Sequence, residues 1–351
     1  MELLRIIAMF LIVVSHYAVH GVTNTALGYA ECGSYLDFFR FFGNFGVNLF
    51  VLISGFYMIT QTVTPRKIFY LLFQVSFYSI SLYVLASVFI YENACISLSE
   101  FLHFLFPVMY SKYWFVTTYV QLLILTPFLN SFLNRASLRM FVAFIFACIL
   151  ILIYFRLVNC PLLLFVSVYS IGAFVRLHRS KLLALSSKFC FFLTFSLLSV
   201  YIAVVSYSHH IFHYTHRLIS LLFFSQYSLF ILLLSVSCFL FFTQVRIKKS
   251  ALINMVASSA LGIYLIHEHP LIRDYIWQNV FHVKDWYQSD SFYMYCLFSV
   301  ISIFVCCALI DIVVNRFIIR PIWQLVDMLG AIIKRKLKSR VATASNIDGK
   351  C

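Results

Sequence analysis

Long apolar runs separated by short polar segments are the main pattern of the chain. A helix needs about 20 apolar residues to cross the hydrocarbon core of a bilayer. Ten runs fit this length, and they predict an all-α bundle with about ten membrane-spanning helices. The runs are 3–20, 43–61, 68–91, 113–133, 140–158, 161–177, 189–207, 218–243, 251–272 and 292–318.

The composition supports a polytopic membrane protein and excludes several other classes. Of the 351 residues, 63% are hydrophobic and 11% are charged, with a mean hydropathy of +0.95. Ordinary globular chains carry about 25% charged residues, and a soluble fold this apolar would expose large apolar patches. Disordered chains, collagens and disulfide-rich secreted domains have different compositions and are also excluded.

The positive charges indicate how the protein sits in the membrane. With the N-terminus in the cytoplasm, 20 of the 26 Lys and Arg residues fall on the inner side. Cytoplasmic loops carry such an excess, so we expect an even number of spans and both termini inside. The same rule accounts for the net charge of +14. Outside the apolar runs there is no basic stripe with interleaved aromatics, so no nucleic-acid partner is expected.

The chain divides into one membrane-embedded domain, 1–320, and a basic cytoplasmic tail, 321–351. We expect the tail to lie at the anionic inner leaflet of the bilayer. The aromatic outer segments are too small to fold alone, so we expect them to lie on the membrane surface or to cover a cavity. They are 21–42, 92–112, 208–217 and 273–291.

Arg5 and His16 stand out because polar side chains within a span are costly. They are eleven residues apart, which at 100° per residue is about 20° from three full turns, so they share one helix face. The rise of 1.5 Å per residue separates them by about 16.5 Å, with the imidazole near mid-membrane. This stripe suits an anionic molecule that enters from the cytoplasm. The alternative is a snorkelling arginine and a structural histidine.

Other polar residues near span ends are weaker candidates. Asn44 and Asn48 lie one turn apart in the second run, where small residues favour helix packing as the main role. Arg66 and Lys67 follow that run; they can bind phosphate, or they can simply be topology signals. The candidates for substrate contact are Asn44, Asn48, Tyr113, Trp114, His267 and Glu268.

Two of these candidate groups have plain structural interpretations. Tyr113 and Trp114 begin the fourth run and fit an interfacial aromatic belt. His267 and Glu268, with His269, end the ninth run. Neighbours on a helix point about 100° apart, so these three cannot chelate one metal ion unless the helix breaks. We therefore predict no metal site.

Four segments, taken together and in order, carry a resemblance to a known family. Arg5 is followed by Ala8 and His16; residues 46–56 read Gly-Val-x-Leu-Phe-x-x-x-Ser-Gly-Phe; residues 113–130 contain Tyr-Trp-Phe and Pro-Phe-Leu-Asn; and residues 262–267 read Gly-Ile-Tyr-Leu-Ile-His. Over 1–320 the chain resembles the acyltransferase-3 family of integral membrane acyltransferases, with Phe56 where the family usually has Tyr. It looks closest to members that O-acetylate surface polysaccharides, of the enterobacterial-common-antigen and intercellular-adhesin types.

The resemblance implies an activity and its substrates. An acyl-CoA, usually acetyl-CoA, would enter from the cytoplasm, and its acyl group would pass to a hydroxyl of a surface polysaccharide or lipid-linked glycan outside. The location would be the bacterial inner membrane, and the donor would be a substrate, with no bound cofactor. By similarity, His16 would be the catalytic imidazole and Arg5 a catalytic contact on the CoA side. Arg66 and Lys67 stand where the family usually carries arginines, and lysine binds phosphate without a bidentate fork.

A glycan hydroxyl needs a base with a pKa near neutrality, which histidine supplies. His16 could deprotonate the hydroxyl for direct attack on the thioester, or it could carry the acyl group itself. A transporter or flippase of polysaccharide or lipid-linked sugar would share the ten spans, but it would not consume CoA. A sensor or scaffold would need neither Arg5 nor His16.

Overall fold

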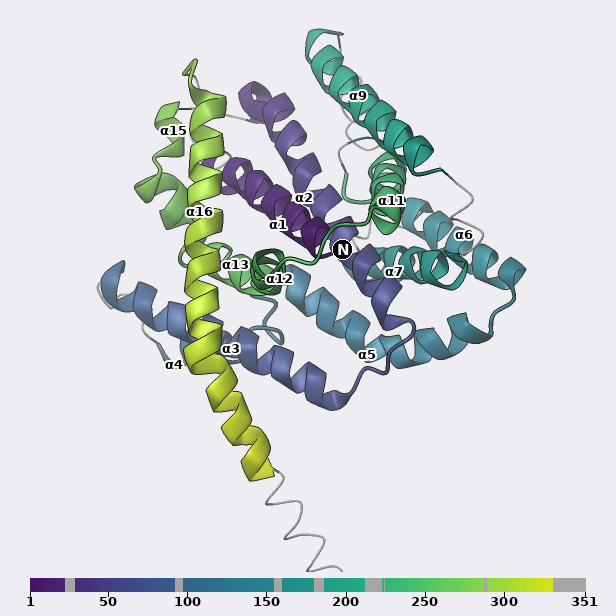
Figure 1. The fold of residues 1–351 in the computed structure, drawn as a ribbon. Coiled ribbons are helices and arrows are strands. Elements are labelled where there is room, and N and C mark those ends of the chain that lie inside the picture. The colour runs from purple at the N-terminus through teal and green to yellow at the C-terminus, as the bar shows by residue number, and fades with distance from the viewer. Residues whose placement is uncertain are drawn as a thin grey trace, which may run out of the picture. The chain divides into compact units, whose positions relative to one another are not determined.

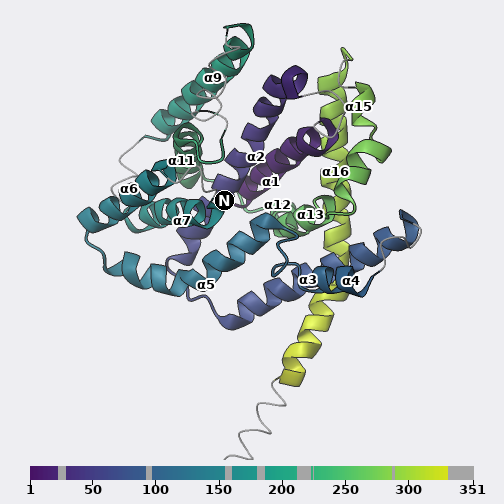
Figure 2. The same ribbon diagram turned by 180° about the vertical axis from the view of Figure 1, so that it is seen from behind.

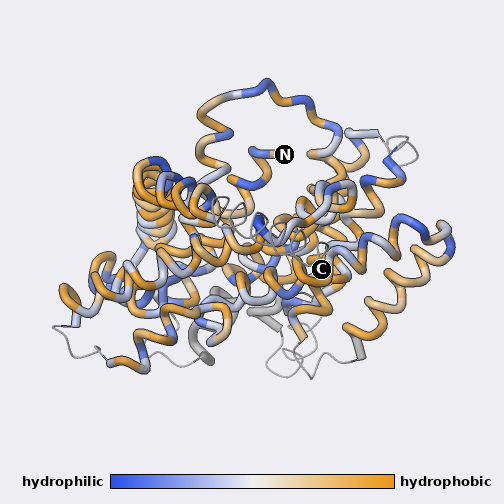
Figure 3. Tube along the Cα trace, turned by 90° about the horizontal axis from the view of Figure 1, so that it is seen from below, coloured by the Kyte–Doolittle hydropathy of each residue, from blue (hydrophilic) through white to orange (hydrophobic). Residues whose placement is uncertain are grey.

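The computed structural model describes residues 1–22, 29–91, 97–154, 160–179, 186–211, 223, 225–286 and 289–330. Every regular element within these ranges is helical (Figure 1), as the apolar runs predict. Hydrophobic residues cover most of the trace, and hydrophilic residues form short stretches between them (Figure 3). The all-α fold class is therefore confirmed.

The helices, in chain order, include several that are too short to cross a membrane. They are α1 (Glu2–His16), η1 (Tyr17–Val22), α2 (Tyr29–Met58), α3 (Pro65–Phe89), α4 (Leu98–Leu105), α5 (Trp114–Arg135), α6 (Leu138–Tyr154), α7 (Pro161–Leu177), α9 (Ser187–Ile211), α11 (Leu229–Gln244), α12 (Ala251–Ser258), α13 (Ala260–His267), α14 (Arg273–Tyr275), η4 (Ile276–Val280), α15 (Val283–Trp286), α16 (Phe292–Val314) and η5 (Asn315–Ile319).

Six helices in the described part are long and apolar enough to cross a membrane, judged by length and composition. They are Glu2–Val22, Phe38–Met58, Pro65–Phe89, Trp114–Arg135, Ser187–Tyr207 and Phe292–Gly330. The other four predicted spans coincide with shorter apolar helices of 10–17 residues, at Leu138–Leu152, Pro161–Leu177, Leu229–Gln244 and Ala251–His267. The count of ten spans and the cytoplasmic position of both termini therefore stay predictions.

Helix α2 lies between α1 and α7 and is packed closely against both; its course beside α1 is visible from both sides (Figures 1 and 2). A Cβ added at Gly46 would lie 2.6 Å from the backbone oxygen of Ala8 in α1. At the crossing with α7, a Cβ on Gly55 would clash with the backbone of Tyr169, and one on Gly172 would clash with that of Leu52. Small residues let membrane helices approach this closely, so the expected packing role of the second span is confirmed.

The predicted ninth span, 251–272, is in fact two short helices, α12 and α13, which meet at Ser259. The second ends at His267, five residues before the predicted end. Proline disfavours the helical conformation at the residue before it, and Pro270 follows His269. This early end lets Glu268 and His269 leave the helical direction, a break without which His267, Glu268 and His269 could not chelate one metal ion.

Two further boundaries differ from the predictions. The segment 21–42 was predicted as an outer loop, but α2 begins at Tyr29 and runs unbroken into the second span. The segments 92–112 and 273–291 contain the short helices α4, α14, η4 and α15. These outer segments are therefore partly helical. A helix satisfies the backbone N–H and C=O groups of such a segment internally.

The described chain forms two compact units, Met1–Ala308 and a second one from Leu309 onward. In the second unit the helix that begins in α16 continues through η5 as far as Gly330, beyond the predicted end at 318. The predicted tail therefore begins as helix, and residues 331–351 lie outside the described ranges. All candidate site residues belong to the first unit.

Candidate active site

A cavity of about 610 Å³ in the first unit collects half of the candidate residues singled out from the sequence. Arg5, His16, Asn44, Trp114 and Glu268 all line it. Much of the remaining wall is apolar and includes Met9, Ile12, Val47, Phe50, Phe115 and Leu261. The prediction that Arg5 and His16 share one helix face is confirmed, because both point into the same space.

A second cavity, of about 480 Å³, lies next to the first. Arg5, Ser54 and Tyr119 line both cavities, so they form a shared wall. The hydroxyl groups of Ser54 and Tyr119 lie 3.2 Å apart in that wall. Lys67 lines the second cavity but not the first. Of the three basic residues expected on the donor side, Arg5 thus lines both cavities and Lys67 lines the second.

Arg5 is held at the junction of the two cavities by a local ion pair. Its Nη1 atom lies 3.0 Å from Oε2 of Glu2, one turn earlier in α1. About a third of the Arg5 side chain is exposed, so the guanidinium is accessible from the cavities. Leu4, Ala8 and Val13, which flank this stripe on α1, are fully buried, and their packing fixes the rotation of the helix and with it the direction of Arg5 and His16.

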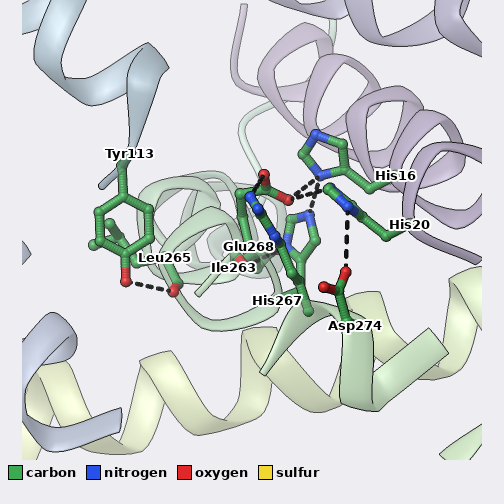
Figure 4. A network of polar contacts seen from close by, with 9 residues as sticks. His16, His20, Tyr113, Ile263, Leu265, His267, Glu268 and Asp274 are labelled. Carbon is green, nitrogen blue, oxygen red and sulfur yellow. Dashed lines mark hydrogen bonds and ion pairs between the residues drawn. The ribbon is translucent and has the colours of Figure 1, made fainter. Parts of the chain in front are cut away.

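His16 lies in a cluster of polar side chains from α1, η1 and the end of α13 (Figure 4). Its Nδ1 atom is 2.8 Å from Nε2 of His267 and 3.2 Å from Oε2 of Glu268. The helix widens into the π-helical turn η1 directly after His16, as helices frequently do at functional sites. The next turn brings the ring of His20 to within 5.4 Å of the His16 ring, measured between centroids.

Glu268 is the centre of charge in this cluster. Its side chain is 6% exposed, and its Oε2 atom lies 3.0 Å from Nε2 of His20. Its Oε1 atom accepts a hydrogen bond of 3.1 Å from Nη1 of Arg273. A buried carboxylate is costly unless it is paired, and here the guanidinium of Arg273 supplies the pairing. Asp274 extends the cluster outward, with Oδ1 3.7 Å from Nδ1 of His20.

A buried hydroxyl completes the described wall near His16. Tyr264 lines the first cavity, and its ring centroid lies 6.4 Å from that of His16. Among the described residues its oxygen has no hydrogen-bond partner.

Four of the predicted residues lie outside the cavity walls. Asn48 is buried in the helix packing, and Tyr113 is buried with its hydroxyl donating to the carbonyl of Leu265. His267 is fully buried behind His16. Arg66 is exposed and lines neither of the two cavities. These placements follow from the rotation of each helix, which spacing along one helix does not determine.

The His-Glu-His run divides between two surroundings. His267 and Glu268 face His16, whereas Nε2 of His269 lies 3.2 Å from the backbone oxygen of Ser79 in α3. A different group, His16, His20 and Glu268, has ligand atoms within 4.8 Å of one another.

Sequence reasoning missed His20, Tyr119, Arg273 and Asp274. The spacing of four residues between His16 and His20 was a usable signal, since side chains at this spacing lie on one helix face. Arg273 and Asp274 carry no comparable signal. They reach the cluster because the chain turns after His269, where the backbone N–H groups of Ile272 and Arg273 donate to its carbonyl.

The fold and the site define a class: a membrane protein with several apolar helices and a buried imidazole, beside a carboxylate, that opens onto a cavity with an arginine at its other end. Such a site is suited to group transfer through histidine. The chain belongs to the acyltransferase-3 family, whose model, described as an acyltransferase domain, matches residues 1–311. It is therefore a multi-pass membrane acyltransferase, and the resemblance seen in the sequence is confirmed.

The family match spans the whole first unit, including all residues of the candidate site. None of the curated proteins and none of the solved structures compared with the chain matches it.

Proposed function

We propose that this protein is a membrane O-acyltransferase that moves an acyl group, in the simplest case acetyl, from cytoplasmic acyl-CoA to a hydroxyl of an extracytoplasmic glycan. The acceptor would be a surface polysaccharide or a lipid-linked glycan at a bacterial inner membrane. The family match supports acyl transfer. It lends no support to the alternative of a polysaccharide or lipid-linked sugar transporter, which would not consume CoA.

The observation that carries the proposal is the shared cavity of Arg5 and His16. An acyl-CoA has anionic phosphates at one end and a thioester at the other. A cationic side chain at one end of an apolar space and an imidazole at the other match this order of groups. Lys67 in the adjoining cavity adds a second positive charge on the same side as Arg5.

His16 would act on the thioester or on the acceptor hydroxyl. In direct transfer the imidazole takes the hydroxyl proton, the oxygen bonds to the carbonyl carbon, the carbon–sulfur bond breaks, and the proton passes to the departing thiolate. In the covalent route the imidazole carries the acyl group between the two substrates. Glu268, 3.2 Å from Nδ1, would stabilise the positive charge that the ring gains in either route.

The test uses inside-out membrane vesicles supplied with radiolabelled acetyl-CoA, followed by extraction of glycans and glycolipids. Label should enter these extracts with the wild-type protein, and His16→Ala should lower the rate by about 10²- to 10⁴-fold, the usual contribution of a general base. His103 provides a matched control, because it lies in α4 beside Glu100 and lines neither described cavity.

The His103→Ala variant should keep wild-type labelling. Both variants should reach the membrane in equal amounts, which immunoblotting checks. Equal labelling by His16→Ala and wild type would remove His16 from the mechanism. Glycan export without any use of acetyl-CoA would instead favour the transporter.

A further inference from the structure

We propose that His267 is a positioning residue that fixes the tautomer of His16, so that Nε2 is the His16 nitrogen that keeps its lone pair for chemistry. The sequence predicts His267 as a substrate contact, whereas in the structure it lies behind His16 and outside both cavity walls. The proposal rests on the proposed function, since it adds a residue to the same site.

The contact of His267 with the backbone of Ile263 shows which ring nitrogen of His267 carries the proton. Its Nδ1 atom lies 2.6 Å from the backbone oxygen of Ile263, one turn earlier in α13. A carbonyl oxygen only accepts hydrogen bonds, so Nδ1 carries a proton. The side chain is fully buried, where an added charge is costly. A neutral His267 with its proton on Nδ1 presents only a lone pair at Nε2.

The contact with that lone pair then shows which ring nitrogen of His16 carries the proton. Nδ1 of His16 lies 2.8 Å from Nε2 of His267. Because Nε2 of His267 can only accept, Nδ1 of His16 must donate, and a neutral His16 therefore has a bare Nε2. Figure 4 shows this second nitrogen on the side of the ring away from His267. Neutral imidazole has one donor and one acceptor nitrogen, so the assignment is complete.

Glu268 has a different part in this arrangement. Its Oε2 atom lies 3.2 Å from Nδ1 of His16 and 3.0 Å from Nε2 of His20. The contact with His16 does not have hydrogen-bond geometry. The N–H of His16 is therefore directed at His267, and Glu268 supplies charge. Orientation and charge, which one carboxylate provides in many histidine sites, are here divided between two residues.

The tautomer matters for both chemical routes. In direct transfer Nε2 takes the proton of the acceptor hydroxyl and later gives it to the CoA thiolate. In the covalent route Nε2 bonds to the carbonyl carbon as the thiolate leaves, and the hydroxyl that then displaces the imidazole gives its proton to that thiolate. A proton on Nε2 would block both routes until the ring exchanged tautomers.

The experiment compares two substitutions of His267 in the full-length protein, purified and reconstituted into lipid vesicles, with acetyl-CoA and a glycolipid extract as substrates. His267→Leu removes the acceptor and should lower kcat by about 10- to 100-fold, the loss typical when the partner that orients a metal-bound histidine is removed. His267→Gln places a side-chain oxygen near the lost Nε2 and should recover a large part of that loss. KM for acetyl-CoA should not change in either variant, because His267 lines neither cavity.

His269→Leu is the matched control for the loss of a buried histidine. His269 is as buried as His267, and its ring bonds to the backbone of Ser79 and Leu271 without contact to His16. Turnover per folded protein should stay close to wild type, with the folded fraction taken from size-exclusion chromatography in detergent.

Unchanged kcat in both His267 variants would overturn the proposal. Equal losses in the Leu and Gln variants would also overturn it, because they would show that packing and not the acceptor atom is needed. A wild-type protein that consumes no acetyl-CoA, or a His16→Ala variant as active as wild type, would overturn the proposed function itself and this inference with it.

Discussion

His16 shows how a single residue obtains its role from several neighbours at once. Its ring contacts His267 at 2.8 Å, Glu268 at 3.2 Å and the cavity on its open side. Arg5 shares the cavity and is paired with Glu2. At this scale the donor–acceptor distances and angles decide whether two side chains form a hydrogen bond or interact only through their charges.

Substitutions of Lys67 and Arg66 test whether the donor contacts one particular base or responds only to the total positive charge of the inner loop. Lys67 lines the second cavity and Arg66 does not, although they are neighbours in the first turn of α3. Lys67→Ala should raise KM for acetyl-CoA by about 2- to 5-fold, the size of an exposed ion pair, and the effect should fade at high salt. Steady-state rates at two ionic strengths measure both.

Arg66→Ala removes the same charge and serves as the control. It should leave KM unchanged at both ionic strengths. If the two variants raise KM equally, the pair acts only through the total charge of the inner loop, and Lys67 has no particular contact with the donor.

Two features of whole elements bring the site together. The π-helical turn after His16 carries His20 toward Glu268, and the end of α13 at His267 lets Glu268 turn to the same place. The close crossing of α2 with α7, through Gly55 and Gly172, fixes the helix that supplies Asn44 and Ser54 to the cavities. Backbone approach of this kind leaves no room for a side chain.

Larger residues at the α2–α7 crossing should lower the stability of the protein without changing its kinetics. Gly55→Ala and Gly172→Ala each place a Cβ against backbone atoms that cannot move aside, and overpacking of this kind costs about 1–3 kcal/mol. Thermal unfolding of the detergent-solubilised protein should therefore shift to lower temperature. Gly330→Ala is the control, since within the described residues no atom beyond its chain neighbours and its own helix backbone lies within 4 Å of its added Cβ.

Neither Gly55 nor Gly172 lines a described cavity, so KM for acetyl-CoA should be retained by the folded fraction of each variant. An unfolding temperature equal to that of Gly330→Ala would mean that the α2–α7 crossing can relax more than the backbone contacts indicate.

At the scale of the molecule, the distribution of bases predicts the orientation that the proposed function needs. An acyl-CoA donor is cytoplasmic, and Arg5 stands near the N-terminus of a chain with most of its bases on the predicted inner side. Green fluorescent protein fused to either terminus should fluoresce, and alkaline phosphatase fused at the same points should be inactive. Opposite results at the two termini would indicate an odd number of spans.

The sequence by itself determined the properties that depend on local chemistry and composition. Apolar runs specify helices and a membrane because each run must satisfy its backbone hydrogen bonds internally. The spacing of Arg5 and His16 specifies one face because the helix has a fixed geometry. The motifs identified the family, which the match over 1–311 confirmed.

Only the tertiary structure decided which distant residues meet. His267 lies 251 positions from His16 along the chain, yet their rings are in contact. Nothing in the order of residues shows that Lys67 lines a cavity while Arg66 does not. Nor does it show that His267 contacts His16 while His269 contacts the backbone of α3. These outcomes depend on how each helix is rotated and where it ends, which is set by packing against neighbours from other parts of the chain.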